Sequence, residues 1–292
     1  MSLLTDTQGT QERVWSCMSA VAAADGRLGR DDLQALLNPN FMRQGQQRNP
    51  TDSGPKQTIG ATVSLGLIAF ENGTYRLKVQ PAQTYAEFTD RVHVRLCTIG
   101  PDDADYLVLE TYAWMLLEID KRQALHWTAQ PAVPFATAVE NDIGNPAGGE
   151  LRINDTKVPH WRRWVQMMDL AVDLPGGLGF HPTLTGRLSR EIERMALPRD
   201  VEIPLSDFLA SVARAMPYVD GGALQAVVLE KTGQKVERRK ISRLLSMGLR
   251  DLADAGQIEL VVRGDAANTY ELAADDRSEA SVLGIVLKGT PE

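Results

Sequence analysis

Hydrophobic residues recur at helical spacing along most of this chain. At 100° per residue, residues 11–24 place Val14, Cys17, Met18 and Val21 on one face of a helix. The same spacing, with cap and stop residues at the ends, predicts helices over 29–38, 58–65, 85–96, 103–127, 160–170, 184–195, 205–216, 223–231 and 238–254. We therefore expect a mainly α-helical chain.

Two segments alternate apolar and polar residues and predict small hairpins. Asn72 and Gly73 interrupt the alternation of residues 66–79, which is typical of a two-residue hairpin turn. Residues 258–263 and 269–272 flank the turn-rich GDAAN and predict a second hairpin. A late apolar patch at 282–287 indicates a strand or a docking segment. The expected fold class is mainly α with small β-hairpins (α+β).

The order helix, helix, helix, hairpin occurs twice and suggests three domains. Residues 1–80 and 201–292 each carry this order, and residues 81–200 form a mostly helical middle. The first copy contains a polar insert at 40–56 with few apolar side chains, which we predict to be a mobile loop.

Charge is distributed unevenly. The net charge of −7 argues against a protein that coats nucleic acid indiscriminately. Residues 231–250, however, carry seven cations against one acid, whereas residues 87–120 carry eight acids against two arginines. This asymmetry suggests two different partners, or one solvated acidic face and one nucleic-acid face.

The basic stretch coincides with the third expected helix of the C-terminal copy. A helix over 238–254 places apolar residues such as Ile241, Leu244 and Leu252 on one face. Its other face is expected to be solvated and to carry Arg239, Ser242, Arg243, Ser246 and Arg250.

This order of elements, together with a Tyr-x-Leu close at 75–77 and 270–272, resembles the winged helix-turn-helix proteins. The resemblance implies binding of duplex DNA, with the third helix in the major groove and the hairpin as a wing. The implied DNA contacts are Lys235, Arg238, Arg239, Lys240, Ser242, Arg243, Ser246, Arg250 and Arg263, with a second set at Lys56, Thr58 and Thr62. A solvated helix surface is the alternative. Asp102, Asp103 and Asp105 of the acidic run are candidates for contact with a basic protein partner.

No pattern of catalysis or cofactor binding is present. The four histidines lack ligand spacing, and two distant cysteines make no zinc motif. Neither G-x4-G-K-[ST] nor G-x-S-x-G occurs, so we expect no enzyme activity, no cofactor and no metal. Trp161 and Trp164 have the helical spacing of core residues. The absence of an export signal or an apolar run of ~18 residues predicts a cytoplasmic protein without membrane contact.

A second resemblance covers more of the chain. The RVWSCMSAV helix at 13–21 and the block WRRWVQMMDLAVDLPGGLGFHPT at 161–183, followed by the C-terminal copy, resemble DpdG-type proteins. These proteins are encoded in bacterial clusters that insert or police 7-deazaguanine derivatives in DNA. The resemblance implies an accessory, non-enzymatic protein that works with ATPase and helicase partners.

Three functional hypotheses follow from these patterns. The first is a non-catalytic DNA-binding accessory subunit of a bacterial phage-defence or DNA modification and restriction assembly. The second is a winged-helix transcriptional regulator that binds an operator as a homodimer. The third is a protein-interaction scaffold that does not bind DNA.

Overall fold

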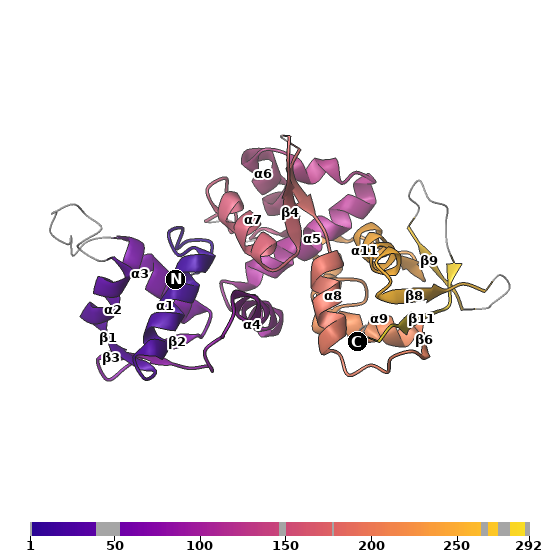
Figure 1. The fold of residues 1–292 in the computed structure, drawn as a ribbon. Coiled ribbons are helices and arrows are strands. Elements are labelled where there is room, and N and C mark those ends of the chain that lie inside the picture. Colours follow the sequence, from indigo (N-terminus) through magenta and orange to yellow (C-terminus); the bar gives the residue numbers. More distant parts are fainter. Residues whose placement is uncertain are drawn as a thin grey trace. The chain divides into compact units, whose positions relative to one another are not determined.

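The computed structural model of the chain describes residues 2–38, 53–145, 150–176, 178–263, 268–273 and 281–289 (Figure 1). Two compact units divide the chain. One comprises Met1–Val108 with Thr156–Met167, and the other comprises Leu109–Asp155 with Met168–Glu292. Both are mainly helical and carry small sheets, which confirms the coarse fold class.

The first unit begins with a module of three helices and three strands. Its elements are α1 (Gln11–Ala23), β1 (Arg27–Gly29), α2 (Arg30–Leu37), α3 (Ser53–Ser64), β2 (Ile68–Glu71) and β3 (Thr74–Leu77). The antiparallel sheet has the order β1-β3-β2. Asn72 and Gly73 both have positive φ, 50° and 80°, as a type I′ turn requires. The predicted hairpin is therefore confirmed.

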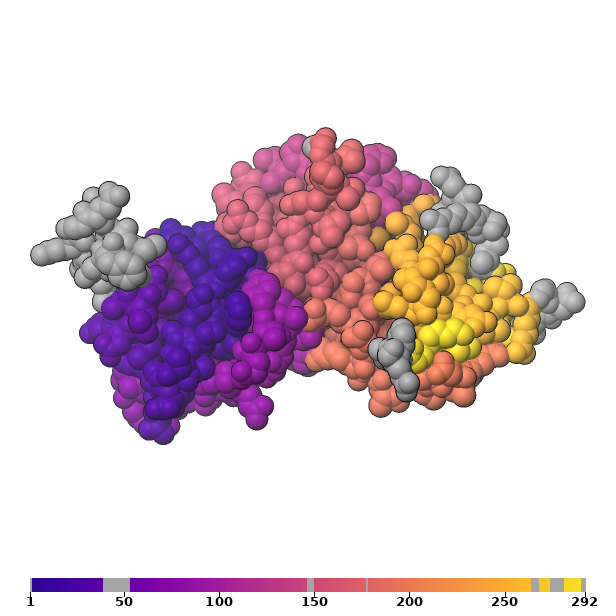
Figure 2. Space-filling model, in the orientation of Figure 1, coloured from indigo at the N-terminus to yellow at the C-terminus, as the bar shows by residue number. Residues whose placement is uncertain are grey.

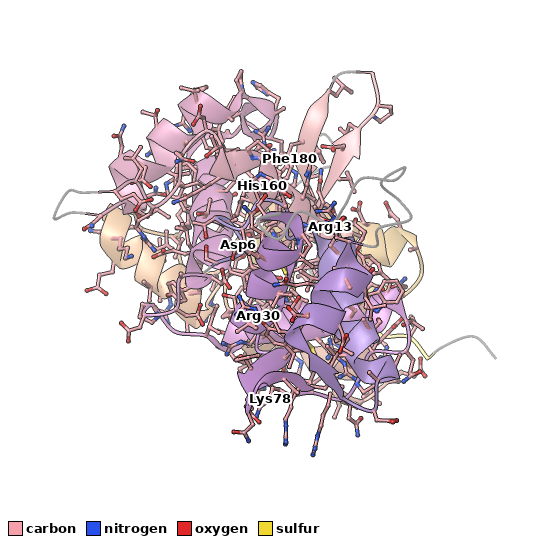
Figure 3. All side chains as sticks on the ribbon, turned by 90° about the vertical axis from the view of Figure 1, so that its left-hand side faces the viewer. Asp6, Arg13, Arg30, Lys78, His160 and Phe180 are labelled. Carbon is pink, nitrogen blue, oxygen red and sulfur yellow. The ribbon has the colours of Figure 1, made fainter. Side chains whose placement is uncertain are left out.

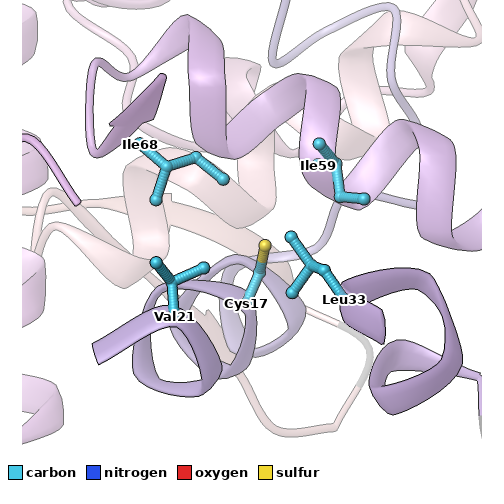
Figure 4. Close-up of a cluster of buried hydrophobic side chains, with 5 residues drawn as sticks. All are labelled: Cys17, Val21, Leu33, Ile59 and Ile68. Carbon is cyan, nitrogen blue, oxygen red and sulfur yellow. The ribbon is translucent and has the colours of Figure 1, made fainter. Parts of the chain in front are cut away.

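The core of this module joins all three helices to the sheet. Cys17 and Val21 from α1, Leu33 from α2, Ile59 from α3 and Ile68 from β2 are buried together (Figure 4). Burial raises the pKa of the Cys17 thiol to about 11, so this side chain behaves as a small apolar group.

The polar insert is shorter than predicted. Helix α3 begins at Ser53 and not at Thr58, because Pro55 is tolerated in a first turn, where no intrahelical N–H bond is lost. Residues 53–56 are therefore helical, and the expectation of a mobile loop over 40–52 lies outside the described residues.

The first unit also contains α4 (Tyr85–Thr98), the start of α5 (Tyr106–Arg122) and α7 (Lys157–Met167). Thr84 caps α4, its hydroxyl oxygen accepting a hydrogen bond from the Glu87 amide (3.1 Å). Trp161 and Trp164 are buried, and Trp161 Nε1 donates to the Val108 carbonyl (2.9 Å). The prediction that both tryptophans are core residues is confirmed.

The second unit opens with the rest of α5, followed by a 3-10 turn (His126–Ala129), α6 (Ala132–Ile143), β4 (Ala171–Leu174), β5 (Gly179–Pro182) and α8 (Thr185–Arg194). The sequence missed α6, since its prolines read as a break. Pro131 is in fact the N-cap residue and Pro134 lies in the first turn, where proline is compatible with a helix.

The C-terminal part of this unit carries two three-stranded sheets. Its elements are β6 (Glu202–Pro204), α9 (Leu205–Ala215), α10 (Ala223–Thr232), β7 (Lys240–Ile241), α11 (Arg243–Asp254), β8 (Ile258–Val261), β9 (Tyr270–Leu272), β10 (Ser281–Val282) and β11 (Gly284–Leu287). One sheet has the order β6-β11-β8 and the other β10-β9-β7. In Figure 2 the yellow C-terminal segment lies against the orange surface of this unit.

Two predictions about this part are wrong. Strand β8 does not pair with β9; it pairs with β11, with Leu260 opposite Ile285, because the late apolar patch supplies a strand with three buried residues. Strand β9 instead joins β7 and β10. The basic helix begins at Arg243 and not at Arg238, since Lys240 and Ile241 are extended in β7.

The elements of the C-terminal part repeat the arrangement of the N-terminal module. Helix α8 packs against α9 and α11, and the series α8, β6, α9, α11, β8, β11 has the sheet order first, third, second strand. The series α1, β1, α2, α3, β2, β3 has the same order of elements and of strands. Helix α10 and the β10-β9-β7 sheet are additions to this common pattern.

Candidate nucleic-acid interface

The basic stretch lies mainly in the segment before α11. Gly233, with φ of 65°, ends α10, and the following residues have no helical structure. Lys235, Arg238, Arg239 and Lys240 in this basic loop (residues 233–240) are all exposed. The structure thus separates three of the predicted DNA contacts, Arg238, Arg239 and Lys240, from the helix to which the sequence assigned them.

The basic loop is anchored to β9. Arg239 has a positive φ of 62°, its carbonyl accepts a hydrogen bond from the Glu271 amide (2.9 Å), and its Nη2 donates to Asn268 (2.6 Å). Lys240 lies 3.3 Å from Glu237, an exposed pair that stabilises little. In the described part of the chain, no hydrogen bond or ion pair engages the head groups of Lys235 and Arg238.

A cavity of about 770 Å³ lies beside the basic loop. The four cations line it together with apolar residues of α9, the Tyr270 ring of β9, and the carboxylates Asp120 and Asp220. All of these residues belong to the second unit. The cavity therefore combines a cationic rim, apolar wall and acidic groups.

Two carboxylates hold the start of α11. Asp220 accepts a hydrogen bond from the Ser242 amide (2.7 Å) and Asp120 accepts one from the Arg243 amide (2.8 Å). Both amides belong to the first, otherwise unpaired donors of the helix, where negative charge is favourable. Burial, with a further contribution from Asp220, raises the pKa of Asp120 to about 6, and burial also raises the pKa of Asp220.

Helix α5 directs part of the acidic run toward the basic stretch of the same chain. Lys231 Nζ lies 2.6 Å from Oε1 of the fully buried Glu110, and Gln234 Nε2 donates to Glu118 (2.9 Å). With Asp120, three of the eight acids in residues 87–120 therefore have partners in or just after α10 or at the start of α11. These three carboxylates do not form a free acidic surface.

Two predicted DNA contacts are buried, which corrects the expectation of a solvated face. Ser246 is fully buried; its hydroxyl donates to the Ile241 carbonyl (3.2 Å) and accepts from the Ala273 amide (2.9 Å). Arg250 is 9% exposed. The added β7 and β9 segments supply the groups that bond Ser246, and the helical spacing alone gave no sign of them.

Ser242 and Arg243, two further predicted DNA contacts, are half-buried. Arg263 is exposed, and its guanidinium lies 2.7 Å from Glu202.

The second set of predicted DNA contacts does not form an exposed polar group on α3. Thr58 and Thr62 are buried and donate to the carbonyls of Gly54 (2.8 Å) and Thr58 (2.7 Å), so only Lys56 of this set is exposed. Other cations of the module, Arg13, Arg30 and Lys78, come from α1, α2 and the end of β3 and lie apart from one another (Figure 3).

The three candidate partner-binding aspartates have different environments. Asp105 is 1% exposed and accepts hydrogen bonds from the Leu3 amide (2.6 Å) and the Ser64 hydroxyl. Asp103 lies 3.2 Å from Arg95, and Asp102 is exposed. Asp105 therefore does not belong to an exposed acidic surface, because its carboxylate joins Leu3 to α3 inside the first unit. Partner contact by the acidic run stays a prediction.

The described residues contain no group of three or more histidines, cysteines or acids that is arranged to hold a metal ion. Within the same residues, no helix has the length and apolar character needed to cross a membrane. Burial lowers the pKa of His160 and of His181, as expected for histidines in structural positions.

These observations define a mainly helical protein in which one arrangement of helices and a three-stranded sheet occurs twice, with a basic loop and cavity in the second unit. The chain belongs to the DpdG-like family, whose model matches residues 1–266. Membership of this family suggests a role in the DNA modification cluster with which DpdG is associated. No curated protein and no solved structure matches the chain.

Proposed function

We propose that this chain is a non-catalytic, DNA-binding accessory subunit of a bacterial DNA modification, restriction or phage-defence assembly. Membership of the DpdG-like family supports the association of the chain with such an assembly. The observation that carries the DNA contact is the row of exposed cations Lys235, Arg238, Arg239 and Lys240, directly before α11. Exposed cations neutralise phosphates and release counterions, which is the main source of affinity for DNA.

The arrangement of elements supports a winged-helix assignment for both repeated modules. In each, three helices precede a two-stranded wing, and the first strand pairs with the third. In helix-turn-helix proteins the start of the last helix faces the major groove. In the second unit this position belongs to Arg243, with the basic loop next to it. Arg263, after β8, has the position of a wing residue.

The function of the loop is tested by the salt dependence of binding to a 20-base-pair duplex. Four neutralised phosphates give a log–log slope of about −3 to −4, since each contributes about 0.9. We expect K235A/R238A/K240A to reduce this slope to about −1. The control R13A/R214A/K288A removes three cations that lie outside the loop, the exposed Arg13 and Arg214 and the half-buried Lys288, and should keep the parent slope. Equal slopes for the two triple variants would refute the assignment of DNA contact to the loop.

The assembly proposal is tested by co-purification from the native cell, in which an ATPase or helicase should accompany the tagged chain. The other two hypotheses make different predictions in the same experiments. A regulator binds a palindromic site with half-sites about one helical turn apart and self-associates. A scaffold captures protein partners without binding the duplex at any salt concentration.

A further inference from the structure

The cavity beside the basic loop offers two kinds of recognition at once. Lys235 and Lys240 place positive charge on its lining, and Asp120 places a carboxylate there. Leu209, Ala213 and Tyr270 supply apolar surface between these polar groups along the lining. Its volume of about 770 Å³ is within the range of small-molecule sites.

The carboxylate of Asp120 retains capacity for a ligand. Its Oδ1 accepts one hydrogen bond, from the Arg243 amide. In the described residues no donor reaches Oδ2. An ionised carboxylate has about four acceptor positions, so three remain. The second carboxylate, Asp220, differs because both of its oxygens already accept hydrogen bonds, Oδ2 from the Ser242 amide (2.7 Å) and Oδ1 from Gln225 Nε2 (3.3 Å). Asp120 is therefore the group available to a ligand.

We propose that this cavity binds a guanine-type nucleotide, with Asp120 accepting hydrogen bonds from the N–H edge of the base and with Lys235 and Lys240 contacting the phosphate. Guanine presents two neighbouring donors, a ring N–H and an exocyclic amine, and both match one carboxylate. Adenine presents a ring acceptor beside its amine, and this ring nitrogen would repel a carboxylate oxygen. Tyr270 and the apolar side chains of α9 contact the faces of the base.

Proximity of Asp120 to Asp220 strengthens the preference for a donor-rich ligand. The two carboxylates repel each other, and two N–H donors at Asp120 offset this repulsion. The same nucleotide chemistry is available from two sources, a free nucleotide and an unpaired nucleotide of bound DNA.

The test is calorimetric titration of the full chain with GMP, guanosine and AMP. We expect GMP to bind at least tenfold more tightly than AMP, because AMP lacks one of the two hydrogen bonds to the charged carboxylate, and hydrogen bonds to charged groups are the strong ones. D120N should weaken GMP binding at least tenfold, whereas the control D207N, an exposed aspartate of α9, should not. K235A/K240A should lower the affinity for GMP to that for guanosine. Circular dichroism of each variant reports whether it is folded.

Competition against GMP distinguishes the sources. Because a duplex and GMP share Lys235 and Lys240, a duplex that carries one unpaired guanine is compared with a fully paired duplex of the same length. Stronger displacement of GMP by the duplex with the unpaired guanine indicates that the ligand is part of DNA, whereas equal displacement by the two duplexes indicates a free nucleotide. The inference is overturned if GMP does not bind at 1 mM, binds no better than AMP, or binds folded D120N with unchanged affinity. Duplex binding that depends on the loop but occurs without GMP binding would overturn this inference alone. GMP binding without duplex binding would overturn only the proposed function.

Discussion

Lys231 Nζ lies 2.6 Å from Oε1 of Glu110 and thereby connects the end of α10 to the buried side of α5. Arg152 contacts the other oxygen of the same carboxylate. Glu110 is fully buried, whereas the side chains of Lys231 and Arg152 reach solvent. The two cations therefore compensate the negative charge of Glu110, which the protein interior would otherwise disfavour.

We expect K231A to lower the free energy of unfolding by about 1–3 kcal/mol, because the variant leaves the Glu110 carboxylate with one cation instead of two. Urea unfolding, followed by circular dichroism, measures this change. The control K288A removes an exposed pair with Glu259 and should change stability by less than about 1 kcal/mol. Equal effects of the two variants would show that the buried carboxylate does not depend on Lys231.

Asp120 should make the second unit less stable above about pH 6. Its pKa is 3.8 in the unfolded chain and about 6 in the folded protein, so the folded state binds the proton more tightly between these values. Stability therefore falls as pH rises from about 4 to 6, by about 3 kcal/mol for this group.

We expect D120N to be more stable than the parent at pH 7 and to lose less stability between pH 4 and 6. Urea unfolding at several pH values measures both quantities. Asp220 remains in this variant and keeps part of the pH dependence, because burial raises its pKa as well. A parent and a D120N variant with parallel stability profiles would contradict the assignment.

Ser246 should contribute to folding and not to DNA contact. We expect S246A to lower the free energy of unfolding by about 1–3 kcal/mol, since the half-buried Ala273 amide loses its acceptor. The exposed Ser206 provides the control, and S206A should be nearly neutral. The salt slope of duplex binding by folded S246A should equal that of the parent; a reduced slope would return Ser246 to the DNA interface.

Gly73 should be required by the turn between β2 and β3. Its φ of 80° favours glycine, so we expect G73A to destabilise the first unit by about 1 kcal/mol. Gly100 has open space and no positive φ, which makes G100A a matched control that should be neutral or slightly stabilising. Thermal unfolding of the two variants should therefore shift in different directions or by different amounts.

The sequence by itself determined the local elements. Helical spacing located α1, α4, α9 and α10 within a few residues, and Asn72-Gly73 located the first hairpin, because both signals depend on neighbours in the chain. The spacing of Trp161 and Trp164 also identified core residues correctly. The division into domains at residues 80 and 200 stays a prediction.

Only the tertiary structure decided which strands pair and which polar residues reach solvent. Strand β8 pairs with β11 and not with β9, and this pairing joins segments that are more than twenty residues apart in the chain. Ser246 and Arg250 occupy the polar side of a helical wheel but are buried, because segments outside the helix cover them. Burial is set by everything that packs against a side chain, whereas periodicity records only the residue's own helix. For the same reason, the sequence showed a basic and an acidic run without showing that Lys231 and Glu110 meet.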